Sequence, residues 1–367
     1  MMHIILTYRF LILLTLLFLV AACQTGAYSV VNLNQLNLVL RQQKTSANVR
    51  FTLLQANIGN VDPLCSLYAR SKLCHQDVEN RIAQSIQQLK PDIVSLQEVL
   101  PDWICRQGKL GGQGQVCHNY QTRPIRDQAR RLLGQQYTIV CEPHHSWDCI
   151  GVRNGFASVQ PDSQGHFCPS GGLCGTERLS AGDRQAGNRD SAYHPYYTQT
   201  IESHLDDGFH VMSLDILIKG RPVRLVNGHP QSGHKSSEYE ARGKQIHQLF
   251  ERFANQPKTL IAGDLNLDPF RQSDSSVQAL NQFVDNYGVK GQLIATKAFH
   301  YHSGPVEQPP VWPPRLTAQY LWPLPSGTLD HVLSNFAGGT CHTLDANEHL
   351  SGGKGTDHKA LWCQLGF

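Results

Sequence analysis

Short apolar stretches that end in polar residues recur along the chain and limit what it can fold into. They have the length of β-strands, and segments with helical apolar spacing lie between some of them. Because strands that alternate with helices form a mixed sheet, the pattern predicts an α/β domain whose strand ends meet at one rim. The six stretches span residues 51–55, 93–96, 223–226, 259–262, 329–333 and 360–363.

Two amphipathic helices are predicted between these strands. In the first, Asp77 is predicted as the N-cap, and Pro91 ends the helix because proline cannot continue it. The apolar positions are Val78, Ile82, Ile86 and Leu89 in the first helix and Ile246, Leu249, Phe250 and Phe253 in the second.

Length and charge exclude several classes of protein. The chain has 367 residues, enough for one large domain or two modest ones. Its net charge of +3 is too small to indicate nucleic-acid binding by bulk charge alone. No repeat of a fixed period is visible, which excludes solenoids and propellers.

The N-terminus has the features of an export signal. Arg9 precedes a run of 13 residues, Phe10 to Ala22, of which 12 are apolar. This run is short for a membrane span and normal for a signal peptide. It leads into Cys23 in a sequence that resembles a bacterial lipobox, which implies cleavage after residue 22 and a lipid on Cys23. The alternative is an ordinary signal peptide with a chance cysteine there.

The cysteine count favours the lipidated form. Of 11 cysteines, Cys23 is set apart and leaves ten, an even number that suggests disulfides in an exported protein. A zinc site is the alternative, although no C-x-x-C pair accompanies these cysteines. The simplest pairing joins residues 65–74, 105–117, 141–149, 168–174 and 341–363.

Carboxylates, amides and histidines gather after the strands. Each alone has an ordinary explanation, since Asn and Asp after a strand commonly form turns and a lone histidine is commonly structural. Together at one rim, their oxygens would suit Mg²⁺, Mn²⁺ or Ca²⁺ better than zinc. The residues are Asn57, Glu98, His229, Asp264, Asn266, Asp330, Asp357 and His358.

Two long segments admit more than one interpretation. Arg126, Arg130 and Arg131 lie at helical spacing, so one helix face would be basic; it would be either a solvated surface or a phosphate contact. The proline-rich segment 300–327 carries aromatic residues that could stack on bases, enter a lipid surface, or simply pack.

Seven motifs in a fixed order resemble the endonuclease/exonuclease/phosphatase superfamily, which includes deoxyribonuclease I and neutral sphingomyelinases. The resemblance covers about residues 50–367. It implies an α+β fold, a four-layer αββα sandwich of the deoxyribonuclease I-like type with the site at one edge. The motifs are QANIG (55–59), SLQEV (95–99), NGFAS (154–158), VNGHPQ (226–231), AGDLNLDP (262–269), TLDHVLS (328–334) and GTDHKAL (355–361).

The same resemblance implies the metal site. Glu98 would be the principal ligand of Mg²⁺, or of Mn²⁺ or Ca²⁺. Asn57 and Asp357 would complete the metal environment, directly or through water. A divalent cation would neutralise the substrate's charge and stabilise the transition state of phosphoryl transfer.

Five further residues would carry the chemistry by resemblance. Asp264 would orient or deprotonate the attacking water, and Asn266 would hydrogen-bond the phosphoryl oxygens. His358, held by Asp330, would act as general acid/base or phosphate contact. His229 would contact phosphate or assist the leaving group.

A looser match concerns Glu142. It lies in Cys141-Glu142-Pro143, which resembles a Ser-Glu-Pro stretch of deoxyribonuclease I. The resemblance implies that Glu142 orients His229, although the cysteine departs from that pattern.

The expected protein is therefore a metal-dependent phosphodiesterase that uses in-line attack of water, of nuclease type. The alternatives are a sphingomyelinase-like phospholipid phosphodiesterase, an inositol-phosphate phosphatase, and a non-catalytic surface lipoprotein. The substrate would be a nucleic acid or a phospholipid, and the protein a monomer. We expect a signal peptide at 1–22, a lipidated tether at 23–48 and the catalytic domain at 49–367. Because Gln24 is not an Asp, an outer-membrane lipoprotein facing the periplasm or the cell surface is expected.

Overall fold

Two β-sheets packed face to face form the centre of the described chain. The computed structural model describes residues 49–59, 72–142, 148–161, 167–175, 197–201, 209–269, 274–285, 299–303, 328–344, 356 and 358–367. These residues belong to one compact unit, Gln43–Phe367. The predicted signal peptide, tether and segment 304–327 lie outside the described residues.

The first sheet has seven strands in the order β14-β15-β1-β2-β4-β3-β6. Its central strand β1 pairs in parallel with β2 and antiparallel with β15. The strands are β1 (Arg50–Asn57), β2 (Ile93–Gln97), β3 (Tyr137–Cys141), β4 (Cys149–Arg153), β6 (Leu173–Cys174), β14 (Gly338–Thr343) and β15 (Leu361–Gly366).

The second sheet has eight strands in the order β11-β12-β13-β10-β9-β8-β5, and β7 also pairs with β8. Its centre is β10, parallel to β9 and antiparallel to β13. The strands are β5 (Ala157–Val159), β7 (Tyr197–Ile201), β8 (Phe209–Ile218), β9 (Arg221–Gly228), β10 (Thr259–Asp264), β11 (Val284–Asp285), β12 (Phe299–Tyr301) and β13 (Asp330–Ser334).

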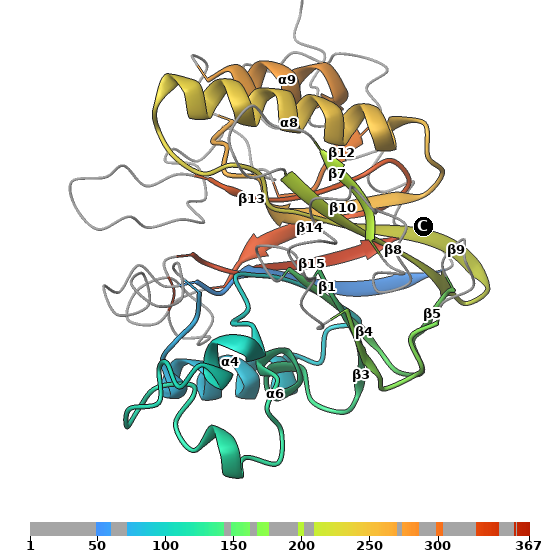
Figure 1. Ribbon diagram of the computed structural model, residues 1–367. Helices are drawn as coiled ribbons and strands as arrows, with labels where there is room; N and C mark the ends of the chain where they lie inside the picture. The colour runs from blue at the N-terminus through green and yellow to red at the C-terminus, as the bar shows by residue number, and fades with distance from the viewer. Residues whose placement is uncertain are drawn as a thin grey trace, which may run out of the picture. The chain divides into compact units, whose positions relative to one another are not determined.

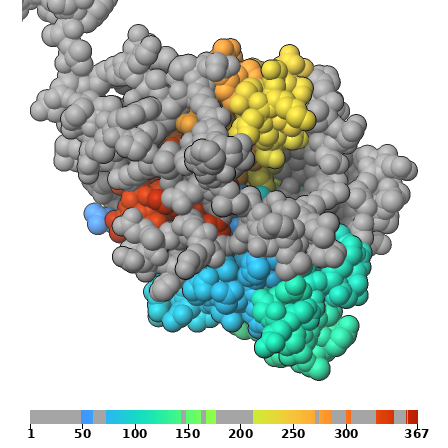
Figure 2. Space-filling view, turned by 90° about the vertical axis from the view of Figure 1, so that its left-hand side faces the viewer, coloured from blue at the N-terminus to red at the C-terminus, as the bar shows by residue number. Residues whose placement is uncertain are grey.

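Helices cover the outer face of each sheet, which gives four layers and confirms the predicted αββα sandwich (Figure 1). Figure 2 shows this order on one face, with yellow α8 on one side, the blue-to-green segment of α4–α6 on the other, and red C-terminal residues between them. No described helix is long and apolar enough to cross a membrane. The helices are α4 (Gln76–Leu89), α5 (Asp102–Arg106), the 3-10 helix η1 (Tyr120–Thr122), α6 (Gln128–Leu133), α8 (Ser236–Ala254) and α9 (Ser275–Phe283).

The predicted helices form with one difference at an end. The N-cap of α4 is His75, and Asp77 lies in the first turn, where its carboxylate is 2.9 Å from Arg81. Asp77 therefore supports the helix by charge near the N-terminus and not as the predicted cap. The apolar face of α8 is buried as predicted.

The inner faces of the central strands change from apolar to polar toward one end. In β1, alternation places Phe51, Leu53, Gln55 and Asn57 on one face; the first two join the core between the sheets. The other central strands change in the same way, with Ile93, Ser95 and Gln97 in β2, Val223, Leu225 and Asn227 in β9, and Leu260, Ala262 and Asp264 in β10. Apolar side chains thus fill the space between the sheets at one end, and amides and carboxylates line it at the other.

Disulfides follow the predicted pairing wherever both cysteines are described. Four bonds join Cys105–Cys117, Cys141–Cys149, Cys168–Cys174 and Cys341–Cys363. Cys74 is also disulfide-bonded, while its predicted partner Cys65 lies outside the described residues. The zinc alternative is therefore wrong for these cysteines.

The arginines predicted to form a basic helix face are mostly structural. Arg130 is 7% exposed, and its guanidinium donates to backbone carbonyls that include those of Gly134 and Tyr137. Arg131 Nε lies 2.6 Å from Glu79 Oε1. Both guanidinium groups are bound by other groups of the protein. The prediction that they form a solvated surface or contact phosphate is therefore wrong for Arg130 and Arg131.

Candidate active site

Five of the predicted residues lie at strand ends and meet at the polar end of the sandwich. Asn57 ends β1, Glu98 directly follows β2, His229 follows β9, and Asp264 ends β10. Asp330 begins the antiparallel strand β13 and is the register partner of Asp264, so it reaches the same edge. Asp357 lies outside the described residues.

Asn57 links the two sheets across this edge. Its Nδ2 donates to Asp264 Oδ2 at 3.0 Å and to Glu98 Oε1 at 3.3 Å. Its Oδ1 accepts the Gly59 N–H at 2.9 Å. In this arrangement Asn57 orients two carboxylates through its nitrogen, and direct metal ligation by its oxygen stays a prediction.

The backbone is strained at two predicted site residues. Glu98 and Asn266 have φ values of 61° and 52°, in the left-handed region that side chains other than glycine rarely adopt. Such conformations persist where surrounding contacts fix them, and they concentrate at functional sites. For Asn266 those contacts are its N–H to Asp264 Oδ1 at 2.8 Å and its Nδ2 to the Pro230 carbonyl at 3.0 Å.

Glycine is required where β9 and β10 approach each other. A Cβ added to Gly263 would lie 2.0 Å from the carbonyl oxygen of Gly228. This contact brings His229 and Asp264, the residues that follow the two glycines, to the same place.

One histidine–carboxylate pair is closely bonded. His358 Nδ1 lies 2.7 Å from Asp330 Oδ2, and both side chains are buried. Because the carboxylate can only accept, Nδ1 carries the hydrogen. The other ring nitrogen, Nε2, lies 3.6 Å from Asp264 Oδ2.

The second pair is looser and joins His229 to Asp148. His229 Nδ1 lies 3.4 Å from Asp148 Oδ1, and neither atom makes a closer hydrogen bond. His229 Nε2 lies 3.8 Å from both Glu98 Oε1 and Asp264 Oδ2. Burial alone lowers the pKa of His229, but the three surrounding carboxylates outweigh it and raise the pKa to about 9.

Asp148 is a carboxylate beside His229, and the orienting role expected of Glu142 stays a prediction. Glu142 is buried, and its backbone N–H donates to the Asp148 carbonyl at 2.8 Å. The negative charge of Asp148 is the largest of the causes that raise the pKa of His229. Asp148 was not predicted because it lies five residues beyond the matched motif, which ends at Pro143. The available signal was a carboxylate next to Cys149, the predicted disulfide partner of Cys141.

A loop after His229 is fixed by helix α8. Gln245 accepts the backbone N–H of Gln231 at 2.8 Å. Arg242, which is 1% exposed, donates to the carbonyls of Gln231 and Gly233 at 3.0 and 3.1 Å. The helix thereby sets the exit of the chain from β9 and with it the placement of His229.

The donor set fits a divalent cation. Glu98 Oε1 and Asp264 Oδ2 share one Asn57 nitrogen, so two carboxylates are held close together. Asp264, Asp330 and His358 also offer ligand atoms within 4.8 Å of one another. Of that group, Asp330 Oδ2 and His358 Nδ1 are already bonded to each other. Glu98 is therefore the better direct oxygen ligand, and Asp264 beside it can orient a water. Hard carboxylate oxygens suit Mg²⁺, Mn²⁺ or Ca²⁺.

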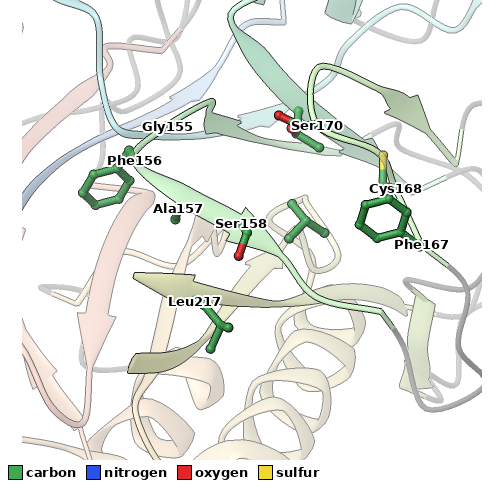
Figure 3. A pocket seen from close by; sticks show the side chains of 10 residues that line it. Gly155, Phe156, Ala157, Ser158, Phe167, Cys168, Ser170 and Leu217 are labelled. Carbon is green, nitrogen blue, oxygen red and sulfur yellow. The ribbon is translucent and has the colours of Figure 1, made fainter. Parts of the chain in front are cut away.

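A cavity of about 330 Å³ lies elsewhere on the sandwich (Figure 3). Leu217 on its wall pairs with Pro222, near the end of the β8–β9 hairpin opposite His229. Its described lining is neutral and contains no histidine or carboxylate, so it lacks the groups that acid–base chemistry needs. The lining residues are Thr138, Gly155, Phe156, Ala157, Ser158, Val159, Phe167, Cys168, Ser170 and Leu217.

Several solved structures are similar to this chain. A humanised TDP2 of D. rerio is 12% identical with a TM-score of 0.50, and the match covers 87% of this chain and 99% of that one. The human Nocturnin catalytic domain is 13% identical with a TM-score of 0.49, covering 86% and 94% of the two chains. An endonuclease/exonuclease/phosphatase family protein from Bacteroides thetaiotaomicron is 12% identical with a TM-score of 0.46, covering 86% and 97%. No curated protein sequence matches.

The family is shown by the sequence itself. The model of the Endonuclease/Exonuclease/phosphatase family matches residues 46–358, which is most of the chain. This confirms the predicted resemblance. The chain belongs to the endonuclease/exonuclease/phosphatase family, whose enzymes hydrolyse phosphoric esters with divalent metal ions.

Proposed function

We propose that the protein is a phosphodiesterase of nuclease type that uses direct attack by water. One observation carries the proposal: two histidines that flank different strands, β9 and β15, direct Nε2 toward the same carboxylate oxygen, Asp264 Oδ2, at 3.8 and 3.6 Å. A diester with a poor leaving group benefits from one group that accepts the proton of water and another that supplies a proton to the departing oxygen.

Each residue then has a defined task. Asp264 Oδ2 accepts the proton of the attacking water, while Asp264 Oδ1 is held by the N–H of Asn266. His229, whose pKa the surrounding carboxylates raise, would donate a proton from Nε2 to the leaving oxygen. His358 donates Nδ1–H to Asp330 and, when its ring carries both hydrogens, donates from Nε2 to a phosphoryl oxygen.

Glu98 would hold the metal, with Asn57 and Asp357 as further predicted ligands. When bound, a divalent cation such as Mg²⁺ neutralises the charge of the phosphate and stabilises the negative charge that develops on its oxygens.

A substrate panel with the purified full-length protein tests the proposal. DNA, RNA, sphingomyelin vesicles and inositol phosphates are each incubated with Mg²⁺, Mn²⁺ or Ca²⁺ and with a chelator. We expect metal-dependent cleavage of DNA or RNA and none of the other substrates. Release of phosphocholine or inorganic phosphate without nucleic-acid cleavage would overturn the nuclease assignment.

Matched variants identify the site of catalysis. Glu98→Gln keeps the shape of the side chain but removes its charge, and we expect a loss of at least about 100-fold in kcat/KM. Ser158→Ala, at the distant cavity, serves as the control and is expected to change kcat/KM by less than about twofold. Full turnover by Glu98→Gln would place the chemistry elsewhere.

We also propose export to an oxidising compartment with a lipid on Cys23. The four described disulfides support the compartment, because such bonds persist outside the reducing cytosol. Mass spectrometry of the protein from a bacterial host tests the lipid: an acylated N-terminal Cys23 is expected, and a chain that starts elsewhere or has an unmodified Cys23 contradicts it.

A further inference from the structure

A chain of buried amides lies directly beneath the proposed site. Gln55, Gln97 and Asn227 are each 0% exposed and come from β1, β2 and β9. Gln97 Nε2 donates to Asn227 Oδ1 at 2.9 Å, and Gln55 Nε2 donates to Gln97 Oε1 at 2.7 Å. The chain therefore crosses from one sheet to the other.

Backbone carbonyls fix the direction of this chain. Asn227 Nδ2 faces the carbonyls of Leu96 at 3.0 Å and Cys149 at 3.4 Å, and a carbonyl can only accept. Asn227 must then present its oxygen to Gln97, so Gln97 must donate there and offer its own oxygen to Gln55. Gln55 is left to present its nitrogen, and reversing any one amide would set oxygen against oxygen.

The chain ends on the carboxylate that holds His358. The same Gln55 nitrogen that donates to Gln97 lies 3.0 Å from Asp330 Oδ1. Both hydrogens of this amide are thus used, while Gln55 Oε1 is buried and has no hydrogen-bond partner among the described residues. A buried carbonyl left unsatisfied is costly, so its retention calls for an explanation beyond stability.

We propose that Gln55, oriented by Gln97 and Asn227, is a positioning residue for the Asp330–His358 pair. Its donor fixes the plane of the Asp330 carboxylate and leaves Asp330 Oδ2 to accept from His358 Nδ1. His358 Nε2 is thereby aimed at the substrate. The inference rests on the proposed function of His358 and extends it to a residue that touches neither substrate nor metal.

A double-mutant cycle tests this role in the full-length protein. Gln55→Met keeps the length of the side chain but removes the donor, and we expect kcat to fall at least about tenfold with KM within about twofold. Asp330→Asn should lower kcat further. If Gln55 acts through Asp330, the double variant is no slower than Asp330→Asn alone; additive losses would overturn the proposal.

Ser95→Ala is the matched control. Ser95 is 3% exposed and accepts from Gln97 Nε2 at 3.2 Å, but it lies beside the path from Asn227 to Asp330. We expect it to lower thermal stability and leave kcat within about twofold. A loss of kcat equal to that of Gln55→Met would mean that any change in the buried network has this effect, and would contradict the proposal.

A measurement that needs no activity separates this inference from the proposed function. The hydrogen on His358 Nδ1 should give a downfield proton resonance because its bond to Asp330 is 2.7 Å. The resonance is identified by its absence in His358→Ala. We expect it to move or broaden in folded Gln55→Met and to persist in Ser95→Ala; an unchanged resonance in Gln55→Met overturns the inference.

Should the wild type cleave no substrate, the proposed function fails while this test still decides the role of Gln55. Asn227→Leu, which breaks the far end of the chain, replaces Gln55→Met if that variant does not fold.

Discussion

The two histidine–carboxylate pairs of the site differ in how they are held. In the Asp330–His358 pair the bond is 2.7 Å, and Gln55 also donates to the carboxylate. In the Asp148–His229 pair the nitrogen and oxygen are 3.4 Å apart. Asp330 begins strand β13, whereas Asp148 precedes β4 and adjoins Cys149, which is bonded to Cys141.

This difference indicates two kinds of task. A histidine fixed through a buried network suits a constant contact, such as hydrogen bonding to one phosphoryl oxygen. A looser histidine surrounded by carboxylates holds its proton strongly and can adjust to a leaving group. The comparison predicts that changes to the Asp330 pair cost more activity than matched changes to the Asp148 pair.

The largest effect is expected for Asp330→Asn. The amide would present a donor or a weaker acceptor to His358 Nδ1 and disturb the tautomer that the carboxylate selects, which lowers kcat by about 10³–10⁴-fold. Steady-state kinetics on the preferred nucleic acid measure it. Circular dichroism confirms that the variant is folded, and a loss below tenfold in a folded variant would remove the distinction between the pairs.

A smaller effect is expected for Asp148→Asn. The residue orients His229 without a short hydrogen bond, so we expect kcat to fall by about 10–100-fold, the range for groups that act by orienting another ligand or catalytic group. The same assay measures it beside Asp330→Asn. If Asp148→Asn is the slower enzyme of the two, the assignment of the tighter pair to the larger role is wrong.

Much of the site followed from sequence because its residues lie in or next to regular strands. Motif matches placed Asn57, Glu98, His229 and Asp264 at strand ends, and parallel or antiparallel register then forces them to one edge. The alternation of β1 also encodes Gln55 on the inner face beneath the site, since it is two residues before Asn57. That signal was available, but an amide in a strand has no distinctive chemistry until its neighbours across the sandwich are known.

Other features could not be read from the sequence because they depend on long-range packing. Arg130 and Arg131 were predicted to face solvent or bind phosphate, yet Arg130 donates to the carbonyls of Gly171 and Gly172, and Arg131 pairs with Glu79. Asp148 follows a segment without a motif, and only the pairing of β3 with β4 brings it to His229. Local patterns specify which face a residue occupies, whereas partners distant in the sequence, such as Glu79 for Arg131, decide what a charge does.

The Asp148–His229 pair should also make the stability of the folded protein depend on pH. Because the folded pKa of His229 is raised to about 9 from its ordinary 6.5, the proton it binds stabilises the fold fully below about pH 6.5. In metal-free protein this contribution to the free energy of unfolding is up to about 3 kcal/mol, and it is lost as pH rises through about 9. Urea unfolding with a chelator, across this range, measures it. Asp148→Asn should flatten the loss; an identical pH profile in the variant would show that Asp148 does not hold the proton.

The smallest effect on activity is expected from the disulfides, which offer a matched comparison. Cys141–Cys149 and Cys341–Cys363 each join directly paired residues on adjacent antiparallel strands. Only the first adjoins Asp148. We expect Cys141→Ser/Cys149→Ser to lower kcat by about three- to tenfold through looser placement of His229. Cys341→Ser/Cys363→Ser should leave kcat within about twofold.

Stability should follow the opposite order. The sequence separations closed by the two bonds are 8 and 22 residues, and a longer closed loop restricts the unfolded chain more. Removing Cys341–Cys363 is therefore expected to cost more free energy of unfolding, by several tenths of a kcal/mol beyond the other bond. Kinetics and urea unfolding on the same two double variants give both readouts. If one variant loses more of both kcat and stability, activity merely tracks global stability, and the disulfide beside Asp148 has no separate part in holding His229.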